Sequence, residues 1–184
     1  MDEIRSWKTV EVNQIQELLS PFNRWCLCGG KSIDLLLGRN TREHGDTDIG
    51  VFRSDLEECL SAIGKDRVFL CDPPGQHSQW DGTPVPNRVN DIWITSADSK
   101  QWVVQVLVFS DDDEFVYYKR NKAMRWSKES HMWHIDDIAI LNPLITFLYK
   151  TNRKRMEEKD IQDVKVLIEE LQQSHALDVA TRRR

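Results

Sequence analysis

The stretch GGKSIDLLLGRNTREHGDTDIG, from Gly29 to Gly50, restricts what this chain can fold into more than any other segment. It joins a glycine pair, a short apolar helical pattern that ends at Gly38, and two aspartates one residue apart at the start of the next apolar run. In a strand, alternate side chains share a face, so Asp46 and Asp48 point the same way and their charges repel. A packed core gains nothing from such a pair. The segment therefore predicts strand, tight turn, helix and strand built around a ligand site.

The remaining patterns predict an α+β fold, a mixed β-sheet flanked by helices with a C-terminal helical segment. Apolar residues at helical spacing predict a first helix that stops before Pro21. A capping box over residues 54–57 predicts a second helix, and Asn142-Pro143 predicts the start of a third, followed by a fourth over Ile161–Leu171. The expected later strands are RVFLC (67–71), DIWIT (91–95), WVVQVLVF (102–109) and FVYYK (115–119), the last three joined as antiparallel hairpins, with an irregular loop over 72–87.

Length and composition narrow the class of protein. With 184 residues, the chain is long enough for one domain, and we expect a domain over 1–135 and a helical segment over 136–184 packed on it. The 30 acidic and 25 basic residues make nucleic-acid binding through bulk charge an unfavourable interpretation. The sequence has no apolar run of membrane-spanning length, no signal peptide and four irregularly spaced cysteines. We therefore expect a cytoplasmic protein.

The chemistry of the Gly29–Gly50 stretch points to phosphate and a divalent cation. Mg²⁺ accepts oxygen ligands from one or two carboxylates and from substrate phosphates, which would relieve the repulsion between Asp46 and Asp48. Gly29 and Gly30 lie between strand and helix, where free amide groups and the helix dipole can hold an anion. Taken singly, the aspartates could be solvated residues and the glycines a simple turn. A Walker motif is excluded, because it would require a glycine at the position of Trp25.

The ordered cluster resembles a known family. Its pattern is similar to the nucleotidyltransferase fold shared by DNA polymerase β and the antibiotic nucleotidyltransferases, in particular the aminoglycoside 2″- and lincosamide nucleotidyltransferases. The residues that carry this resemblance are Trp25, Gly29, Gly30, Ile33, Asp34, Gly38, Arg39, Thr41, Arg42, His44, Asp46 and Asp48. Weaker likeness continues through NDIWIT, WVVQVLVF, FVYYKR, LITFLYK and EKDIQD, where Lys150 and Lys159-Asp160 stand at positions that often carry lysine and Lys-Asp in the family.

The resemblance implies a Mg²⁺-dependent transfer of a nucleoside monophosphate, which we expect to be AMP, from a nucleoside triphosphate such as ATP to a hydroxyl of a small molecule. The acceptor would be an aminoglycoside or lincosamide antibiotic, with resistance as the role. Two Mg²⁺ ions would stabilise the attacking and leaving oxygens. Asp46 and Asp48 would bind the metal, Gly29 and Gly30 would hold the triphosphate, and Arg42, His44 and Lys150 would contact its charge.

One position departs from the family pattern. The third carboxylate of the family aligns with Gln105, whose amide oxygen can ligate a cation weakly but cannot take a proton at neutral pH. Asp91, at the start of the neighbouring strand, could supply that carboxylate, or it could be an ordinary strand-edge aspartate. Two alternatives therefore stay open: a nucleotide-binding protein with lost or altered catalysis, and a transferase that acts on a protein or RNA acceptor.

Other residues have simpler readings. Cys26 and Cys28 share a strand face without a second cysteine pair, which favours small core residues over a zinc site. His131 and His134 lack a metalloprotease context, so we expect loop or strand residues. Four tryptophans could line a cleft for a sugar or a base, although core packing is the simpler role: Trp80, Trp93, Trp126 and Trp133.

Overall fold

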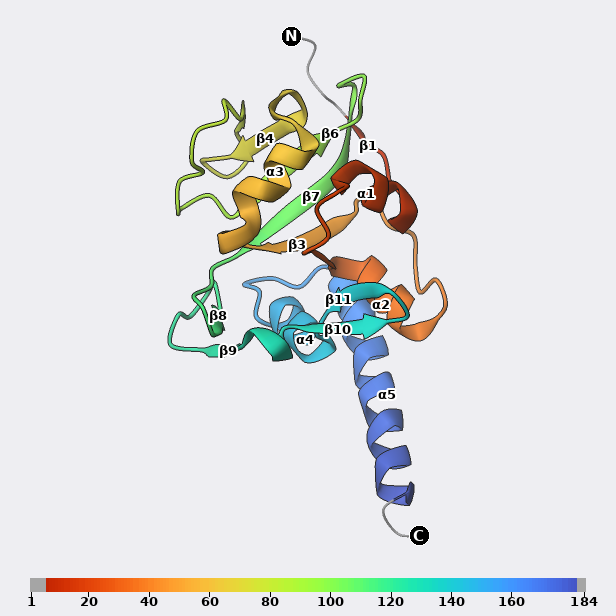
Figure 1. Cartoon of the computed structure of the whole chain (residues 1–184). Coiled ribbons are helices and arrows are strands. Elements are labelled where there is room, and N and C mark those ends of the chain that lie inside the picture. Colours follow the sequence, from red (N-terminus) through yellow and green to blue (C-terminus); the bar gives the residue numbers. More distant parts are fainter. Residues whose placement is uncertain (1–5, 182–184) are drawn as a thin grey trace.

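A computed structural model gives the fold of residues 6–181, with side chains described as far as Gln173 (Figure 1). Its helices are α1 (Val12–Leu19), α2 (Gly29–Leu37), α3 (Leu56–Ile63), α4 (Pro143–Thr151) and α5 (Glu158–Thr181). Its strands are β1 (Ser6–Trp7), β2 (Cys26–Leu27), β3 (Asp48–Phe52), β4 (Val68–Cys71), β5 (His77–Gln79), β6 (Asp91–Thr95), β7 (Gln101–Phe109), β8 (Phe115–Tyr117), β9 (Arg125–Ser127), β10 (Met132–Ile135) and β11 (Ile138–Leu141). The expected α+β class is confirmed.

A mixed sheet organises the domain. Its strand order is β10-β11-β2-β3-β7-β6-β4-β5, and β1 adds to β7. The pairs β3–β7 and β11–β2 are parallel, whereas β2–β3 and β6–β7 are antiparallel. Figure 1 shows β3 and β7 crossing the centre of the molecule, with α5 extending away from the body. The two central strands therefore bring the stretch after Gly45 beside a segment more than 50 residues later in the chain.

Apolar side chains fill both faces of the sheet, but with different partners. The main core packs α1 and α3 against one face, through residues such as Ile15, Leu19, Leu60, Ile49 and Val106. A second cluster on the opposite face joins Cys26, Cys28, Phe109, Leu141 and Ile145, so α4 covers that face near β2 and the end of β7. Within residues 6–181, no helix is both long and apolar enough to cross a membrane.

Local signals explain most helix ends. The Asn142 side chain accepts a hydrogen bond of 2.9 Å from the backbone N–H of Leu144, and Pro143 occupies the first turn of α4, as predicted. Gly38 ends α2 in the left-handed conformation. The predicted capping box at Ser54 is wrong. Its hydroxyl instead donates to Asp111 at 2.7 Å, because the chain makes a short 3₁₀ turn over Arg53–Asp55 before α3 begins.

The strand predictions hold in the centre of the sheet and fail at its borders. The β6–β7 hairpin is confirmed. The expected continuation to 115–119 is wrong, because β8 leaves the sheet and pairs with β9 in a separate two-stranded sheet. The loop over 72–87 contains the short edge strand β5. Helices α4 and α5 pack on each other. Strand β11, which precedes them, belongs to the main sheet. The division of the chain into a domain over 1–135 and a helical segment over 136–184 stays a prediction.

His131 gives the fold a testable dependence on pH. Its side chain is fully buried among Phe52, Phe109 and Trp126, and its Nδ1 accepts a 2.7 Å hydrogen bond from Trp126 Nε1. Burial lowers the pKa of His131 to about 4. The unfolded chain therefore binds more protons between about pH 4 and 6.5, and stability falls as pH falls through that range, by up to about 3 kcal/mol. Urea unfolding at pH 7.5 and 5 should show this loss in the native protein and a smaller loss in His131→Gln. An equal loss in both would contradict the assignment.

Candidate active site

The glycine pair brings the start of α2 against the carboxylate of Asp48. Gly29 begins the helix directly after β2 with a φ of +65°, in the left-handed region. A Cβ on Gly29 would overlap Asp48 Oδ2. Only glycine therefore meets both the backbone conformation and the close approach at this position.

A substitution at Gly29 separates these two constraints. Gly29→Ala should cost the strain of a left-handed alanine, about 1–2 kcal/mol, and in addition should displace the Asp48 side chain. Gly38→Ala is the matched control, because Gly38 has φ +63° but open space around its Cβ position. Chemical unfolding and Mg-ATP calorimetry should show a loss of stability in both variants and a loss of binding in Gly29→Ala alone. Equal binding in both would mean that the close approach has no role at the site.

Gly30 makes a similar contact with the segment before the aspartates. A Cβ at Gly30 would overlap the guanidinium of Arg42 and the ring of His44. His44 Nε2 lies 2.6 Å from Asp34 Oδ2, and the backbone N–H of Thr41 donates to Asp34 Oδ1 at 2.9 Å. Although partial burial favours the neutral acid, the hydrogen bonds from Thr41 and His44 lower the pKa of Asp34. The link to Asp34 thus fixes His44 beside the glycine pair.

The charged form of Asp48 is in an unfavourable environment. It is half-buried at the start of β3, and Asp46 and Asp91 are close enough to affect its ionisation. Burial and the charge of Asp46 raise the pKa of Asp48 to about 7, against the opposing effect of Lys150. A carboxylate held at this cost, beside a second one, suits a bound cation.

Asp91 and Gln105 lie side by side next to Asp48. In the sheet register, Gln105 of β7 pairs with Asp48 on one side and with Trp93 of β6 on the other. Gln105 Nε2 donates to Asp91 Oδ1 at 2.8 Å, and Trp93 Nε1 donates to the same oxygen at 3.2 Å. The amide at the family's carboxylate position thus orients a carboxylate supplied by the neighbouring strand.

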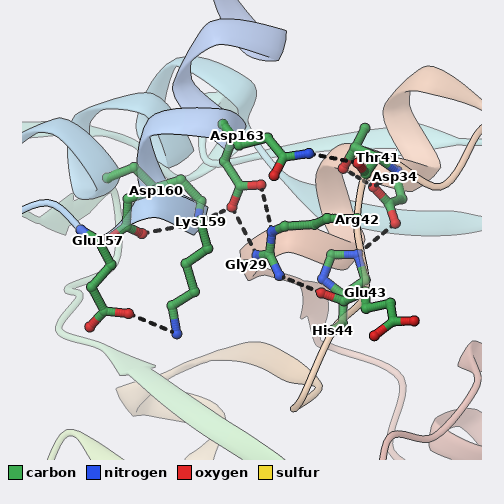
Figure 2. A network of polar contacts seen from close by, with 12 residues as sticks. Gly29, Asp34, Thr41, Arg42, Glu43, His44, Glu157, Lys159, Asp160 and Asp163 are labelled. Atoms are coloured by element: carbon green, nitrogen blue, oxygen red, sulfur yellow. Dashed lines mark hydrogen bonds and ion pairs between the residues drawn. The ribbon is translucent and has the colours of Figure 1, made fainter.

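A buried ion-pair network connects α5 to Arg42, which lies beside the glycine pair (Figure 2). Asp163 of α5 is fully buried and receives Arg42 Nε at 2.9 Å and Arg42 Nη2 at 3.0 Å on its two oxygens. Lys150 Nζ of α4 lies 2.6 Å from Asp163 Oδ2 and 3.5 Å from Asp160 Oδ1. Burial disfavours the charged carboxylate, but the hydrogen bonds from Arg42 and Lys150 lower the pKa of Asp163. Two cations from distant parts of the chain are therefore fixed by one side chain.

A cleft of about 270 Å³ opens beside these groups. Of the residues predicted from the sequence, Gly29, Asp48 and Lys150 line it. Arg42 and His44 line a neighbouring, more open groove with Asp34 and Thr41. The roles assigned to all of these residues stay predictions.

Several residues of the cleft were missed by sequence reasoning. The wall of the cleft contains three cationic side chains, those of Lys119, Arg120 and Arg153. It also contains one polar and two aromatic side chains, those of Asn90, Phe109 and Tyr149. Arg120 donates to the carbonyl of Tyr149 at 2.8 Å and Arg153 to Asp160 at 3.0 Å, so both are anchored to the helical segment. Lys119 ends the strand predicted over 115–119 and Arg120 follows it, which is the one signal that the sequence offers.

The donor set fits Mg²⁺ together with a phosphate substrate. Among residues 6–173, no three His, Cys, Asp or Glu side chains form a closed metal cluster. Asp46 and Asp48 carry hard oxygen donors, and burial together with the charge of Asp46 raises the pKa of Asp48, an effect that a bound cation would offset. Mg²⁺ is commonly bound in this way, by one or two carboxylates with water and substrate phosphates completing its coordination.

Comparisons with known proteins agree with this geometry. The family described as aminoglycoside-2″-adenylyltransferase matches residues 11–85, less than half of the chain. The crystal structure of the lincosamide antibiotic adenylyltransferase LnuA with lincomycin is similar, with a TM-score of 0.57 and 15% identity over 87% of this chain and 98% of that one. The structure of ANT(2″)-Ia with adenylyl-2″-tobramycin matches with a TM-score of 0.48 and 15% identity over 87% of each chain. Among curated protein sequences, none matches.

These findings confirm the resemblance expected from the residues between Trp25 and Asp48. The family match includes the whole glycine and aspartate motif, and the similarity to LnuA extends the shared fold over most of the chain. The chain thus has the fold of that adenylyltransferase structure, and its residues 11–85 are similar to the aminoglycoside-2″-adenylyltransferase family.

Proposed function

We propose that this protein is a Mg²⁺-dependent nucleotidyltransferase that moves AMP from ATP to a hydroxyl of a small molecule such as an aminoglycoside or lincosamide. The observation that carries the proposal is Asp48, a carboxylate with a pKa raised to about 7 that meets Gly29 at the edge of a cation-lined cleft. The match to the aminoglycoside-2″-adenylyltransferase family and the likeness to a lincosamide adenylyltransferase support the same reaction.

The cleft has the charge required for a nucleoside triphosphate. Lys119, Arg120, Lys150 and Arg153 line it, and so does Gly29 at the start of α2, where a helix can hold an anion. Phe109 and Tyr149 add ring surface for a base. The triphosphate would lie along Gly29 and the cations, with its α-phosphate at Asp48.

The reaction would be an in-line displacement at that phosphate. The acceptor hydroxyl oxygen forms a bond to the α-phosphorus, the bond from that phosphorus to the bridging oxygen breaks, and pyrophosphate leaves. Asp91, which accepts a hydrogen bond from Gln105, would accept the hydroxyl proton. Bound at Asp46 and Asp48, Mg²⁺ would neutralise charge on the attacking and leaving oxygens. Lys150 and Arg120 would stabilise the departing pyrophosphate by their charge.

Gln105, an amide where a carboxylate is expected, favours the alternative of a nucleotide-binding protein without transferase activity. The adjacent Asp91 weakens that alternative, because a carboxylate lies next to the amide. A protein or RNA acceptor is the other open alternative. Incubation with α-labelled ATP and Mg²⁺, with tobramycin, lincomycin or cell lysate, separates the three: label on a small molecule, label on a macromolecule, or binding without transfer.

The proposal as a whole depends on Mg-ATP binding. Calorimetry should detect ATP binding that requires Mg²⁺, and Asp48→Asn should remove the metal dependence. A chain that binds no nucleotide, with or without Mg²⁺, would refute the proposal.

A further inference from the structure

Five aromatic side chains form a cluster outside both apolar cores. Its members, called the aromatic cluster below, are Trp7, Phe69, His77, Trp93 and Trp102, contributed by β1, β4, β5, β6 and β7. Trp93 lies at the centre, with ring centroids 4.8 Å from Trp7, 5.2 Å from Trp102 and 4.1 Å from His77. No sequence pattern predicted this grouping, because its members are far apart in the chain.

The aromatic cluster shares a face of the sheet with the carboxylates. Asp48 pairs with Gln105, Gln105 with Trp93, and Trp93 with Phe69, and paired residues project to the same side. Adjacent strands lie about 4.8 Å apart, so Trp93 is roughly 10 Å from Asp48, two strands away. Gln105 lies between them, so a ring that stacks on the aromatic cluster and reaches toward Asp48 would cover the Gln105 side chain.

The cluster is open to solvent on one side. Trp102 and Phe69 are buried, Trp7 and Trp93 are half-buried, and His77 is exposed on the edge strand β5. The apolar core of the domain lies on the other face of these strands, through Ile92, Ile94 and Val104. The exposed ring surface is therefore additional to the core that holds the sheet together.

The cationic cleft, where the nucleotide would bind, and the aromatic cluster lie on opposite sides of Asp48 and Asp91. The cationic cleft follows the end of β7 through Leu107, Val108 and Phe109. Trp102 lies near the start of β7, and Gln105, the partner of Trp93, lies at its middle. In an in-line displacement the attacking group approaches opposite the leaving group. With pyrophosphate among the cations, the acceptor must approach from the aromatic side.

We propose that the aromatic cluster binds the acceptor by stacking against the apolar face of a hydroxylated saturated ring, as in a sugar. The inference rests on the proposed function and names its substrate class. Tryptophan and histidine rings pack against such faces, while hydroxyls at the ring edge reach polar groups. Trp93 and Gln105 both donate hydrogen bonds to Asp91 Oδ1, and these bonds hold the Asp91 carboxylate at the edge of this surface. A ring stacked there presents a hydroxyl to Asp91 and, beyond it, to the α-phosphate at Asp48.

The test uses the full chain and three ring-bearing probes: tobramycin, lincomycin and methyl α-glucopyranoside. Each is titrated by calorimetry and by tryptophan emission, in the presence of Mg²⁺ and a non-hydrolysable ATP analogue. At least one should bind and change the emission. His77→Ala should then weaken its binding by about tenfold, the value of an aromatic contact, and His77→Phe should restore it to within about twofold.

Two controls localise the effect. Trp133→Ala removes an exposed tryptophan on β10, away from the cluster, and should leave probe affinity unchanged. Affinity for the ATP analogue should be the same in all variants. Absence of binding by all three probes, or equal probe affinity in His77→Ala and the native chain, would overturn the inference. Loss of ATP-analogue binding in the native chain would refute the proposed function instead, and probe binding reported by the tryptophans would remain a separate result.

Discussion

Replacing Asp48 with asparagine is expected to lower nucleotidyl transfer by on the order of 10³-fold or more and to leave the folded chain as stable as before, or more stable. The loss would follow from removing the proposed metal ligand, because a bound cation stabilises transition-state charge by several kcal/mol. The gain in stability follows from the environment of Asp48, which burial and Asp46 make unfavourable for a carboxylate. A residue selected for the fold alone would show neither result.

The raised pKa of Asp48 determines how the stability of the metal-free protein changes with pH. With a folded pKa of about 7 against an ordinary value of 3.8, Asp48 keeps its proton longer in the folded than in the unfolded chain. Stability of the metal-free protein therefore falls as pH rises from about 4 to 7 on account of this group. The shift corresponds to at most about 4 kcal/mol, and because solvent reaches the half-buried side chain we expect about 1–3 kcal/mol. This slope opposes that of His131, so each must be measured as a difference between variant and native chain.

Thermal melts at pH 5 and pH 8, with and without Mg-ATP, check the expectation. Asp48→Asn should melt higher than the native chain at pH 8 without ligand, by roughly 2–8 °C, and should lose the increase that Mg-ATP produces. Asp98→Asn is a matched control, since Asp98 accepts hydrogen bonds from Ser96 and Lys100 in an exposed turn. It should melt slightly lower and keep the ligand response. A lowered ligand-free melting temperature in Asp48→Asn, with an intact Mg-ATP response, would contradict the proposal that Asp48 binds Mg²⁺.

Replacing Asp163 with asparagine should produce the largest loss of stability, about 3–5 kcal/mol. The substitution leaves Arg42 and Lys150 facing each other without the buried carboxylate that both contact, and an uncompensated buried charge is costly. Because the same two cations adjoin the glycine motif and the cleft, Mg-ATP affinity should also fall, by about tenfold or more. Stability and binding are thus coupled through one residue.

Urea unfolding of Asp163→Asn, Arg42→Gln and the double variant measures this coupling as a double-mutant cycle. The interaction free energy should exceed about 1 kcal/mol, since the guanidinium contacts both oxygens of a buried carboxylate. Glu157→Gln is the matched control, because Glu157 pairs with Lys159 at 3.2 Å near the surface of the same helical segment. That variant should change stability by less than about 1 kcal/mol. Additive effects of Asp163 and Arg42 would contradict a direct role of their contact.

The sequence determined the centre of the fold because local and chemical constraints coincide there. Gly29 must be glycine for its backbone angle and for the approach of Asp48, and Asp48 starts a strand that is buried beyond it, with Asp46 two residues before. Asn142 and Pro143 likewise mark the start of α4 by local hydrogen bonding alone. Such constraints act within a few residues, so they can be read from a pattern.

Only the tertiary structure decided how distant residues complete the site. Asp163 lies 121 positions after Arg42, and nothing local to either predicts that one buried carboxylate joins it to Lys150. The sheet register likewise places Asp91, Gln105 and Trp93 together, because β6 and β7 pair with one particular alignment, and a shift by one residue would turn these side chains to the other face. The sequence by itself determined the motif of paired glycines and aspartates, whereas long-range packing decided which cations line the cleft and which rings form the aromatic cluster, because burial and strand register depend on the whole chain.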